Sequence, residues 1–311
     1  MNCVLKDAVA YLEHTIGRGD NVKPGIVILN YGTPKETCDL LLKIHSFNIF
    51  HATVIVDNFS VDDSTYIIKN FIQSHDLSNA YFIQTTKNGG YAKGNNIGLR
   101  LLVEQFECDI CFIANPDITF RKKDIVCILK AFEETGYGVL TCRRVVDNGT
   151  KLRQYWKLPT FTDILLDKLY FFRKKHKNEE IYYVSNENGV IDIPVAPGAF
   201  WAVKSNLLSQ VNYLDEETFL FYEENCFARK IINNGYKIGL VKNAEYCVLS
   251  GKASTEEMKK NGKMMQYLIE SQKHYIKKYL KVGPIQMLTY DFFCKINEGE
   301  LKLNRIIGRK K

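Results

Sequence analysis

The sequence lacks any long apolar run: no stretch reaches the roughly 18 consecutive apolar residues from which a membrane-spanning helix is predicted. Residues 1–20 also lack the basic stretch followed by an apolar one that is typical of a secretory signal peptide. We therefore expect neither a transmembrane helix nor a signal peptide. With 46% hydrophobic and 25% charged residues, the 311-residue chain has an ordinary globular composition.

Cysteines arranged in metal-binding pairs are also lacking. The nine cysteines are scattered and odd in number, which predicts free thiols in a reducing compartment, and hence a cytoplasmic location. Cys108 and Cys111 form a C-x-x-C, but residues three apart on a strand point to opposite faces. No second Cys/His pair completes a zinc site, and the six histidines show no ligand spacing, so structural thiols and ordinary histidines are expected.

A net positive charge is missing from most of the chain. Residues 251–311 carry 14 Lys and Arg against 6 Asp and Glu, so the net charge of +7 belongs to this tail. A basic groove for nucleic acid across the core is therefore not expected, and no nucleic-acid partner is predicted. The tail has two interpretations: a solvated basic face, or a contact with an anionic membrane surface, where each basic side chain adds about 1 kcal/mol.

What the sequence does contain is an alternation of strand and helix patterns. Strands are predicted at 25–30, 52–57, 80–85 and 109–115, and helices at 34–47, 62–75, 92–106 and 122–134. This alternation predicts βαβ units and a mostly parallel sheet.

The second half of the chain is less regular. Residues 150–190 show no clear pattern, and further strands are predicted at 137–145, 237–241 and 244–249, with a strand leading into a helix within 196–208 and a helix within 221–236. One amphipathic helix is predicted in the tail, ended by Pro284. Its apolar stripe comprises Met265, Leu268, Ile269, Ile276, Tyr279 and Leu280.

The loops after the first four strands are rich in Asn, Asp, Ser and Gly. They read "NYGTPKE", "VDNFSVDDS", "TKNGGYAKGNN" and "NPD", and the last fixes Asp117 at the end of a strand. Loops are often polar and glycine-rich, but four that share the carboxyl edge of one sheet favour a nucleotide site. A dinucleotide fingerprint, G-x-G-x-x-G, and a P-loop, G-x-x-x-x-G-K-[ST], are both absent.

Five stretches together carry a resemblance: "VDNFSVDDS", "NGGYAKGNNIG", "NPD", "PGAFWAVKSNLL" and "LDEETFLFYEENCFARKIINNGYKI". In this order and spacing they resemble the family 2 glycosyltransferases of the GT-A fold, and most of all the bacterial rhamnosyltransferase-like subgroup. The resemblance implies an α/β fold with a Rossmann-like, mostly parallel central sheet flanked by helices and a helical C-terminal extension. It divides the chain into an N-terminal extension (1–23), a catalytic domain (24–255, with a nucleotide-binding half 24–120 and an acceptor half 121–255) and a basic helical extension (256–311).

The resemblance also implies roles for individual residues. Asp117 would hold a divalent cation, Mn²⁺ or Mg²⁺, which prefers oxygen ligands and donor phosphates. Glu224, preceded by Glu223, would be the general base of an inverting transfer, although two acidic residues at a helix start are also common as partners of the helix dipole. The donor would contact Tyr31, Asp57, Asn58, Ser60, Asn88, Gly90, Tyr91, Asn96, Asn115 and Asp117.

The acceptor site implied by the resemblance comprises Gly198, Ala199, Trp201 and Asp215. Trp201 suits stacking on a sugar, but an aromatic side chain in a strand equally suits core packing. Two departures from the family pattern stand out: Glu224 replaces the usual Asp, and no His precedes "GKAS", which leaves Lys252 available to the phosphates.

The sequence thus predicts a hexosyl or deoxyhexosyl transferase that uses a UDP-, dTDP- or GDP-sugar. The expected acceptor is a glycan, lipid-linked and destined for a surface polysaccharide, which would place the enzyme peripherally on the inner face of the plasma membrane. A non-catalytic nucleotide-sugar or glycan-binding module on the same fold is the alternative, and a nucleotidyltransferase a weaker one. Retention of both Asp117 and Glu224 favours the enzyme, and homo-oligomerisation is left open.

Overall fold

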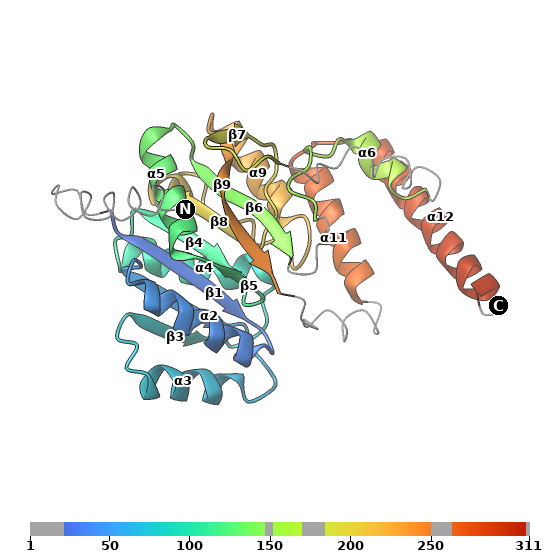
Figure 1. The fold of residues 1–311 in the computed structure, drawn as a ribbon. Coiled ribbons are helices and arrows are strands. Elements are labelled where there is room, and N and C mark those ends of the chain that lie inside the picture. The colour runs from blue at the N-terminus through green and yellow to red at the C-terminus, as the bar shows by residue number, and fades with distance from the viewer. Residues whose placement is uncertain (1–21, 147–151, 170–183, 250–262, 309–311) are drawn as a thin grey trace.

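A computed structural model describes residues 22–146, 152–169, 184–249 and 263–308 of the protein. Its centre is a nine-stranded sheet in the order β3-β2-β1-β4-β8-β6-β9-β5, with β7 paired to β9 (Figure 1). The strands are β1 (Pro24–Asn30), β2 (Ala52–Asp57), β3 (Ala80–Gln84), β4 (Ile110–Ala114), β5 (Ile118–Phe120), β6 (Val139–Val146), β7 (Val190–Asp192), β8 (Phe200–Lys204) and β9 (Ile238–Val248). The helices are α2 (Pro34–Phe47), α3 (Ser64–Ser74), α4 (Tyr91–Glu104), α5 (Lys122–Glu134), α6 (Phe161–Leu166), α8 (Ser205–Gln210), α9 (Glu223–Asn233), α11 (Lys263–Lys278) and α12 (Pro284–Gly308).

The first four strands form the parallel half of the sheet. β1 pairs in parallel with β2 and β4, and β2 pairs in parallel with β3. Every residue of β2 and β4 is buried, as expected for strands covered on both faces. The predicted strands and the helices between them are confirmed, and the carboxyl ends of these strands share one edge, where open α/β sheets bind ligands.

Beyond β4 the sheet becomes mixed. β8 runs antiparallel to β4 and β6, whereas β6 and β9 are parallel, with a register shift between Cys142 and Arg143. The two predicted strands 237–241 and 244–249 are in fact the single strand β9. The short elements β5, α6 and β7 were not predicted, because three to six residues are too few to show a periodic pattern.

Helices cover both faces of the sheet, and alternate residues of each strand point to opposite faces. Ile55 packs in one core with residues of α2, α3 and α5, whereas its neighbours Val54 and Val56 pack in the other with residues of α4, α8 and α9. The eight cysteines in the described part of the chain are free, and six of them are buried, in agreement with structural thiols.

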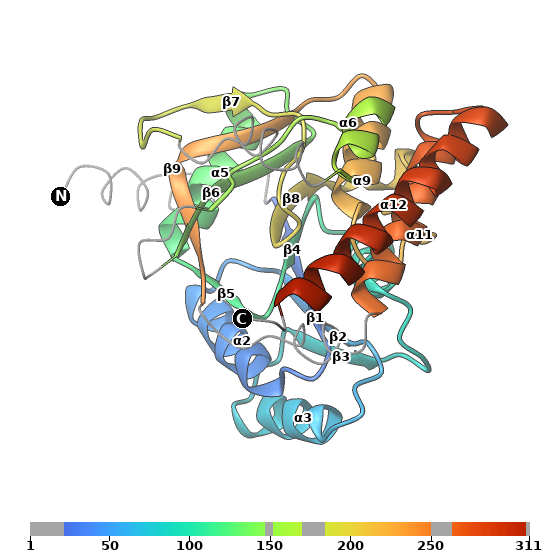
Figure 2. The same ribbon diagram turned by 90° about the vertical axis from the view of Figure 1, so that its right-hand side faces the viewer.

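The C-terminal helices form a third cluster beside the central sheet (Figures 1 and 2). Tyr275 and Ile276 of α11 are buried against α6, α9 and Tyr290 of α12. The predicted helix in the tail is confirmed, but Met265 of its stripe is exposed. Pro284 follows the end of this helix as predicted, and it also begins α12, where its missing N–H costs nothing.

None of the helices in the described part of the chain is both long and apolar enough to cross a bilayer. The predicted N-terminal extension lies, up to residue 21, outside the described residues, as do Lys252 and the predicted domain boundary at 255.

Candidate active site

The loop after β2 is built around Asp57. Asn30 donates a hydrogen bond to Oδ1 of Asp57 over 2.7 Å, and the backbone N–H of Ser60 donates to Oδ2 over 3.2 Å. The hydroxyls of Ser60 and Thr65 also donate to this carboxylate, which is fully buried. Asp57 therefore orders the loop, and its predicted contact with a donor base would require this loop to open.

The neighbouring loop is joined to it by two asparagines. Asn58 donates to Oδ1 of Asn88 over 3.0 Å and to the carbonyl of Gly90 over 3.1 Å. Gly90 has a φ of 86°, and a Cβ at this position would lie 2.3 Å from the carbonyl oxygen of Phe219, so only glycine fits. These contacts explain why the N-x-G element needs its residues: it brings the loop after β3 against the chain that leads into α9.

Tyr91 lies at the centre of the site. It begins α4, and its hydroxyl donates to the carbonyl of Gly198 over 2.5 Å. Burial, followed by the charges of Glu223 and Glu224, raises the pKa of Tyr91 well above its ordinary value. The side chain therefore stays a neutral hydrogen-bond donor that lies close to both carboxylates.

Asp117 follows β4 and lies at the carboxyl edge as predicted. The backbone N–H of Asn115 donates to Ala199 over 3.0 Å, and Leu249 donates to the carbonyl of Asp117 over 2.8 Å, which fixes the NPD turn between β8 and β9. Burial raises the pKa of the Asp117 carboxyl, and the charge of Arg144 partly opposes this rise. A half-buried carboxylate beside a polar loop fits a hard cation that shares its ligands with phosphates.

Glu223 and Glu224 begin α9. The N–H of Gly198 donates to Oε1 of Glu224 over 3.2 Å, whereas Oε2 of Glu223 is buried with no hydrogen-bond partner among the described residues. Burial raises the pKa of both carboxyls, and for Glu223 the charge of Glu224 raises it further. Backbone N–H groups, Arg153 and Arg144 partly oppose the rise in the Glu224 pKa, so Glu224 is the more readily ionised carboxyl of the pair.

Sequence reasoning missed four residues of this site: Arg144, Tyr246, Arg153 and Trp156. Arg144 of β6 lies opposite Tyr246 of β9, and the charge of Arg144 acts on both Asp117 and Glu224. Trp156 donates to Oδ1 of Asn225 over 2.9 Å, and the Arg153 guanidinium lies 4.1 Å from the Trp156 ring. The available signal was the pair of arginines within the apolar strand "GVLTCRRVV", because an Arg in a buried strand needs a partner.

Two predicted site residues lie in the interior instead. Asn96, predicted in the donor pocket, exchanges two hydrogen bonds with the backbone of Leu214 and donates a third to Glu216, so its amide supports a loop. Trp201 is 1% exposed and stacks on Phe227 with ring centroids 5.0 Å apart. Its expected stacking on a sugar is therefore wrong, and the alternative of core packing holds.

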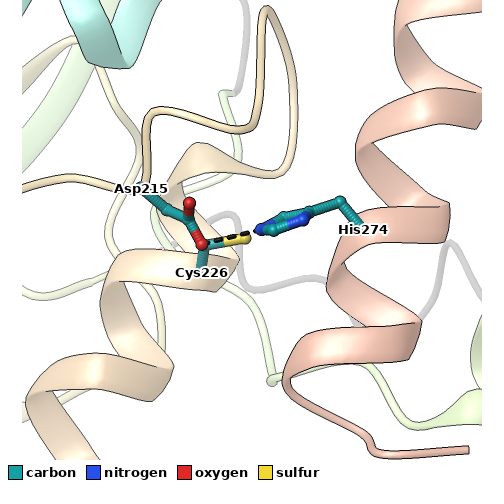
Figure 3. A group of neighbouring side chains, drawn as sticks. All are labelled: Asp215, Cys226 and His274. Atoms are coloured by element: carbon teal, nitrogen blue, oxygen red, sulfur yellow. Dashed lines mark hydrogen bonds and ion pairs between the residues drawn. The ribbon is translucent and has the colours of Figure 1, made fainter.

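Asp215, predicted in the acceptor site, instead holds α11 (Figure 3). His274 lies 2.8 Å from Oδ2 of Asp215, Lys278 lies 3.1 Å from the same oxygen, and Tyr279 donates to it over 2.5 Å. Burial alone would raise the pKa of Asp215, but these three partners outweigh it and hold the pKa well below its ordinary value. The carboxylate is thus fully engaged within the protein.

The same cluster has the composition of a metal site. The ligand atoms of Asp215, Cys226 and His274 lie within 4.8 Å of one another. Burial raises the pKa of the Cys226 thiol, which disfavours the thiolate that metals bind. Because the Lys278 ammonium already pairs with the Asp215 oxygen, we interpret the cluster as an ion-pair network that fixes α11 to the segment between α8 and α9.

Comparison with known proteins agrees with the family resemblance seen in the sequence. Residues 41–208, more than half of the chain, match Glycosyl transferase family 2. The chain belongs to this family. It is 24% identical over 214 residues to the low-salt glycan biosynthesis hexosyltransferase Agl10 of Haloferax volcanii, a match that covers 69% of this chain and 63% of that protein. The chain thus spans less than two thirds of this relative, and the rhamnosyltransferase-like subgroup stays a prediction.

Solved structures identify the fold as GT-A. The mannosyltransferase PcManGT of Pyrobaculum calidifontis, in complex with GDP-Man and Mn²⁺, superposes with a TM-score of 0.55 at 14% identity over 97% of this chain and 87% of that one. TarS residues 1–349 of S. aureus superpose with a TM-score of 0.50 at 17% identity, over 86% of this chain and 77% of that one. GalNAc-T7 with UDP, GalNAc and Mn²⁺ superposes with a TM-score of 0.55 at 11% identity, over 74% of this chain and 44% of that one. At such identities the likeness extends to the fold alone.

Proposed function

We propose that this family 2 protein is an inverting glycosyltransferase. It moves a hexosyl or deoxyhexosyl group from a UDP-, dTDP- or GDP-sugar to a glycan acceptor. The observation that supports this best is the arrangement of Asp117 and Glu224. The backbone N–H of Asn115, two residues before Asp117, donates to Ala199, and the N–H of the adjacent Gly198 donates to Glu224, so the NPD turn and the Glu224 carboxylate contact the same short backbone segment.

Asp117 would hold the divalent cation, Mn²⁺ or Mg²⁺, together with the diphosphate of the donor. When bound, this cation supplies positive charge to the leaving nucleoside diphosphate. The residues present fit such a cation, because a single protein carboxylate plus phosphate oxygens is a common ligand set for these ions. Tyr31 and the loop residues Asn58 and Asn88 are the polar groups proposed to line the nucleotide.

Glu224 acts as the base. Its carboxylate takes the proton of the acceptor hydroxyl while the acceptor oxygen forms a bond to the anomeric carbon of the donor sugar. The bond from that carbon to the phosphate oxygen breaks, and its electron pair leaves with the nucleoside diphosphate. Glu223, whose pKa burial and Glu224 raise, stays protonated beside it, so only one negative charge needs to be accommodated.

The acceptor is proposed to be lipid-linked, and α12 supplies a surface for the bilayer. Ile285, Leu288 and Phe292 are 80%, 69% and 61% exposed and share one face of the helix. The exposed Lys281 and Lys295 flank this face. An exposed apolar stripe next to basic side chains suits the surface of an anionic membrane. If the same face of α12 packed against α12 of a second copy of the chain, Lys281 and Lys295 of the two copies would instead lie close together and repel each other.

The direct test is turnover. The protein is incubated with UDP-, dTDP- and GDP-sugars, Mn²⁺ or Mg²⁺ and a lipid-linked glycan, and the release of nucleoside diphosphate is measured. Acceptor-dependent release with one donor is the expected result. Saturable donor binding without release for every donor and acceptor would identify the non-catalytic binding module instead.

A further inference from the structure

Two adjacent arginines of β6 differ in how their guanidinium groups are used. Arg143 donates from Nη2 to Glu245 over 2.6 Å and from Nε to the carbonyl of Lys242 over 2.7 Å. Nε of Arg144 is buried with no hydrogen-bond partner among the described residues. Because neighbouring strand residues point to opposite faces, the two guanidinium groups lie on opposite sides of the sheet.

The backbone of Arg144 is firmly held even though its Nε–H has no acceptor among the residues that the structure describes. Gln154 accepts a hydrogen bond from the N–H of Arg144 and donates one to its carbonyl, each over 2.7 Å. The backbone from which the Arg144 side chain extends is therefore fixed by hydrogen bonds to Gln154 through both its N–H and its carbonyl. A cation on a fixed backbone with an unused donor is what a site for an anion requires.

Tyr246 adds a second unused group next to Arg144. The two residues are direct partners across β6 and β9, and the ring of Tyr246 packs on Phe200 with centroids 5.5 Å apart. Its hydroxyl is buried and also lacks a partner within the described part of the chain. Buried polar groups in folded proteins nearly always have a partner, so two adjacent orphans indicate that an oxygen acceptor is missing from this place.

The surroundings indicate the charge and location of that acceptor. The charge of Arg144 acts on both Asp117 and Glu224, so the guanidinium lies near both the proposed cation ligand and the proposed base. Neither carboxylate accepts a hydrogen bond from Nε of Arg144. The anion that fits is one that lies near the cation, faces the anomeric carbon and gains charge in the transfer, which describes the leaving phosphate of the donor.

We propose that Arg144, supported by the Tyr246 hydroxyl, binds the terminal phosphate of the nucleoside diphosphate. This inference rests on the proposed function, because the phosphate is that of the sugar donor. A guanidinium group suits this role, since its planar donors match phosphate oxygens and it stays protonated at every relevant pH. As the sugar–phosphate bond breaks, the electron pair moves onto an oxygen that Arg144 contacts, so the interaction strengthens in the transition state.

The test compares the binding of nucleoside diphosphates and monophosphates by calorimetry, with Mn²⁺ present. Arg144→Gln is expected to weaken UDP, GDP or dTDP by about tenfold to a hundredfold, the worth of a charged hydrogen bond. Binding of the matching monophosphate should change less than about twofold by the same argument, because the terminal phosphate is absent. Arg144→Lys should restore part of the difference, and Tyr246→Phe should lose less than Arg144→Gln.

Arg143→Gln is the matched control, because Arg143 is adjacent, equally charged and saturated by Glu245 and Lys242. It should leave the ratio of diphosphate to monophosphate affinity unchanged. An unchanged ratio in Arg144→Gln overturns the phosphate assignment, and a loss confined to nucleotide sugars that carry a carboxylate assigns Arg144 to the sugar instead. A parent protein that binds no nucleoside diphosphate contradicts the proposed function itself.

Discussion

The backbone N–H of Gly198 donates a hydrogen bond to Oε1 of Glu224 over 3.2 Å, across 26 positions of the sequence. A Cβ at residue 198 would lie only 2.8 Å from the same oxygen. The loop before β8 and the first turn of α9 therefore lie so close together that a side chain at residue 198 would displace the Glu224 carboxyl. This contact both places the proposed base and stabilises its ionised form.

Gly198→Ala is accordingly expected to impair transfer without preventing folding. The added methyl group displaces the end of a flexible side chain, which costs little stability, but it moves the carboxylate from its position. We expect kcat to fall by about tenfold to a hundredfold, since a misplacement of 1 Å has an effect of this size. Steady-state kinetics and calorimetric donor binding provide the measurement.

The control for this substitution is Gly136→Ala, because a Cβ at Gly136 meets no atom within 4 Å. It should leave kcat and donor affinity at the level of the parent protein. If Gly198→Ala keeps the kcat of the parent, Glu224 is not positioned by this contact.

Glu224→Gln tests the base directly. The amide keeps the shape of the side chain but accepts no proton, so donor binding should be nearly unchanged while transfer falls by roughly a hundredfold or more. Glu223→Gln should lower the rate less, because in the proposed mechanism Glu223 stays protonated and does not accept the proton of the acceptor. A larger loss at Glu223 than at Glu224 would reverse the two roles.

The same pair predicts how stability depends on pH. Burial raises the pKa of Glu223 above its ordinary value of 4.5, so its contribution to stability is full below that pH and is lost as the pH rises toward the folded-state pKa. Glu223→Gln is uncharged throughout. The parent should therefore lose free energy of unfolding relative to this variant as the pH rises, by about 1.4 kcal/mol for each unit by which the pKa is raised.

Guanidinium unfolding at several pH values between about 5 and 8 measures this difference. Glu133→Gln, at an exposed position of α5, is the comparison, and its curve should run parallel to that of the parent. If the free energy of unfolding of Glu223→Gln also changes with pH in parallel with that of the parent, the ionisation of the Glu223 carboxyl costs no free energy in the folded protein.

Much of the catalytic fold was accessible from the sequence. The helices 34–47 and 122–134 were predicted to the residue, because each has a single apolar face and lies between polar breakers. Within the predicted helical extension, α12 was not recognised as a separate helix because it is apolar on two sides: Tyr290 and Cys294 face inward, while Ile285 and Phe292 face solvent. Such a helix shows no single stripe, so periodicity gives no clear signal.

The candidate site was accessible only in part. The motif spacing led to Asp117, Gly198 and Glu224, and the structure brings the loops that carry them together. It did not indicate that Asn96 and Asp215 turn inward, because their partners come from segments about 60 to 120 positions away. Which polar side chains remain free for a ligand is decided by tertiary hydrogen bonds, and those leave no local pattern in a sequence.

Asp117→Asn tests the proposed cation site. The fold should persist, and donor affinity in the presence of Mn²⁺ should fall on the order of tenfold or more, because even residues outside the ligand shell alter metal affinity by that amount. Affinity in EDTA should match the parent. Asp39→Asn, an exposed carboxylate of α2, is the control. Equal metal-dependent affinity for Asp117→Asn and the parent would remove Asp117 from the cation site.

Flotation with liposomes tests the surface of α12. The parent should float with anionic vesicles at low salt and be released by high salt, because the attraction of Lys281 and Lys295 is screened as the Debye length shrinks. Replacing Ile285, Leu288 and Phe292 by Ser should abolish flotation and leave the fold intact, since these side chains are exposed while Tyr290 and Cys294 hold the helix. Replacing the exposed apolar residues Val61 and Tyr66 by Ser removes comparable surface elsewhere and should leave flotation unchanged.

If the parent does not bind anionic vesicles at low salt, α12 does not bind the membrane. If the triple variant turns an oligomer into a monomer in light scattering, this apolar face is a contact between copies of the chain instead.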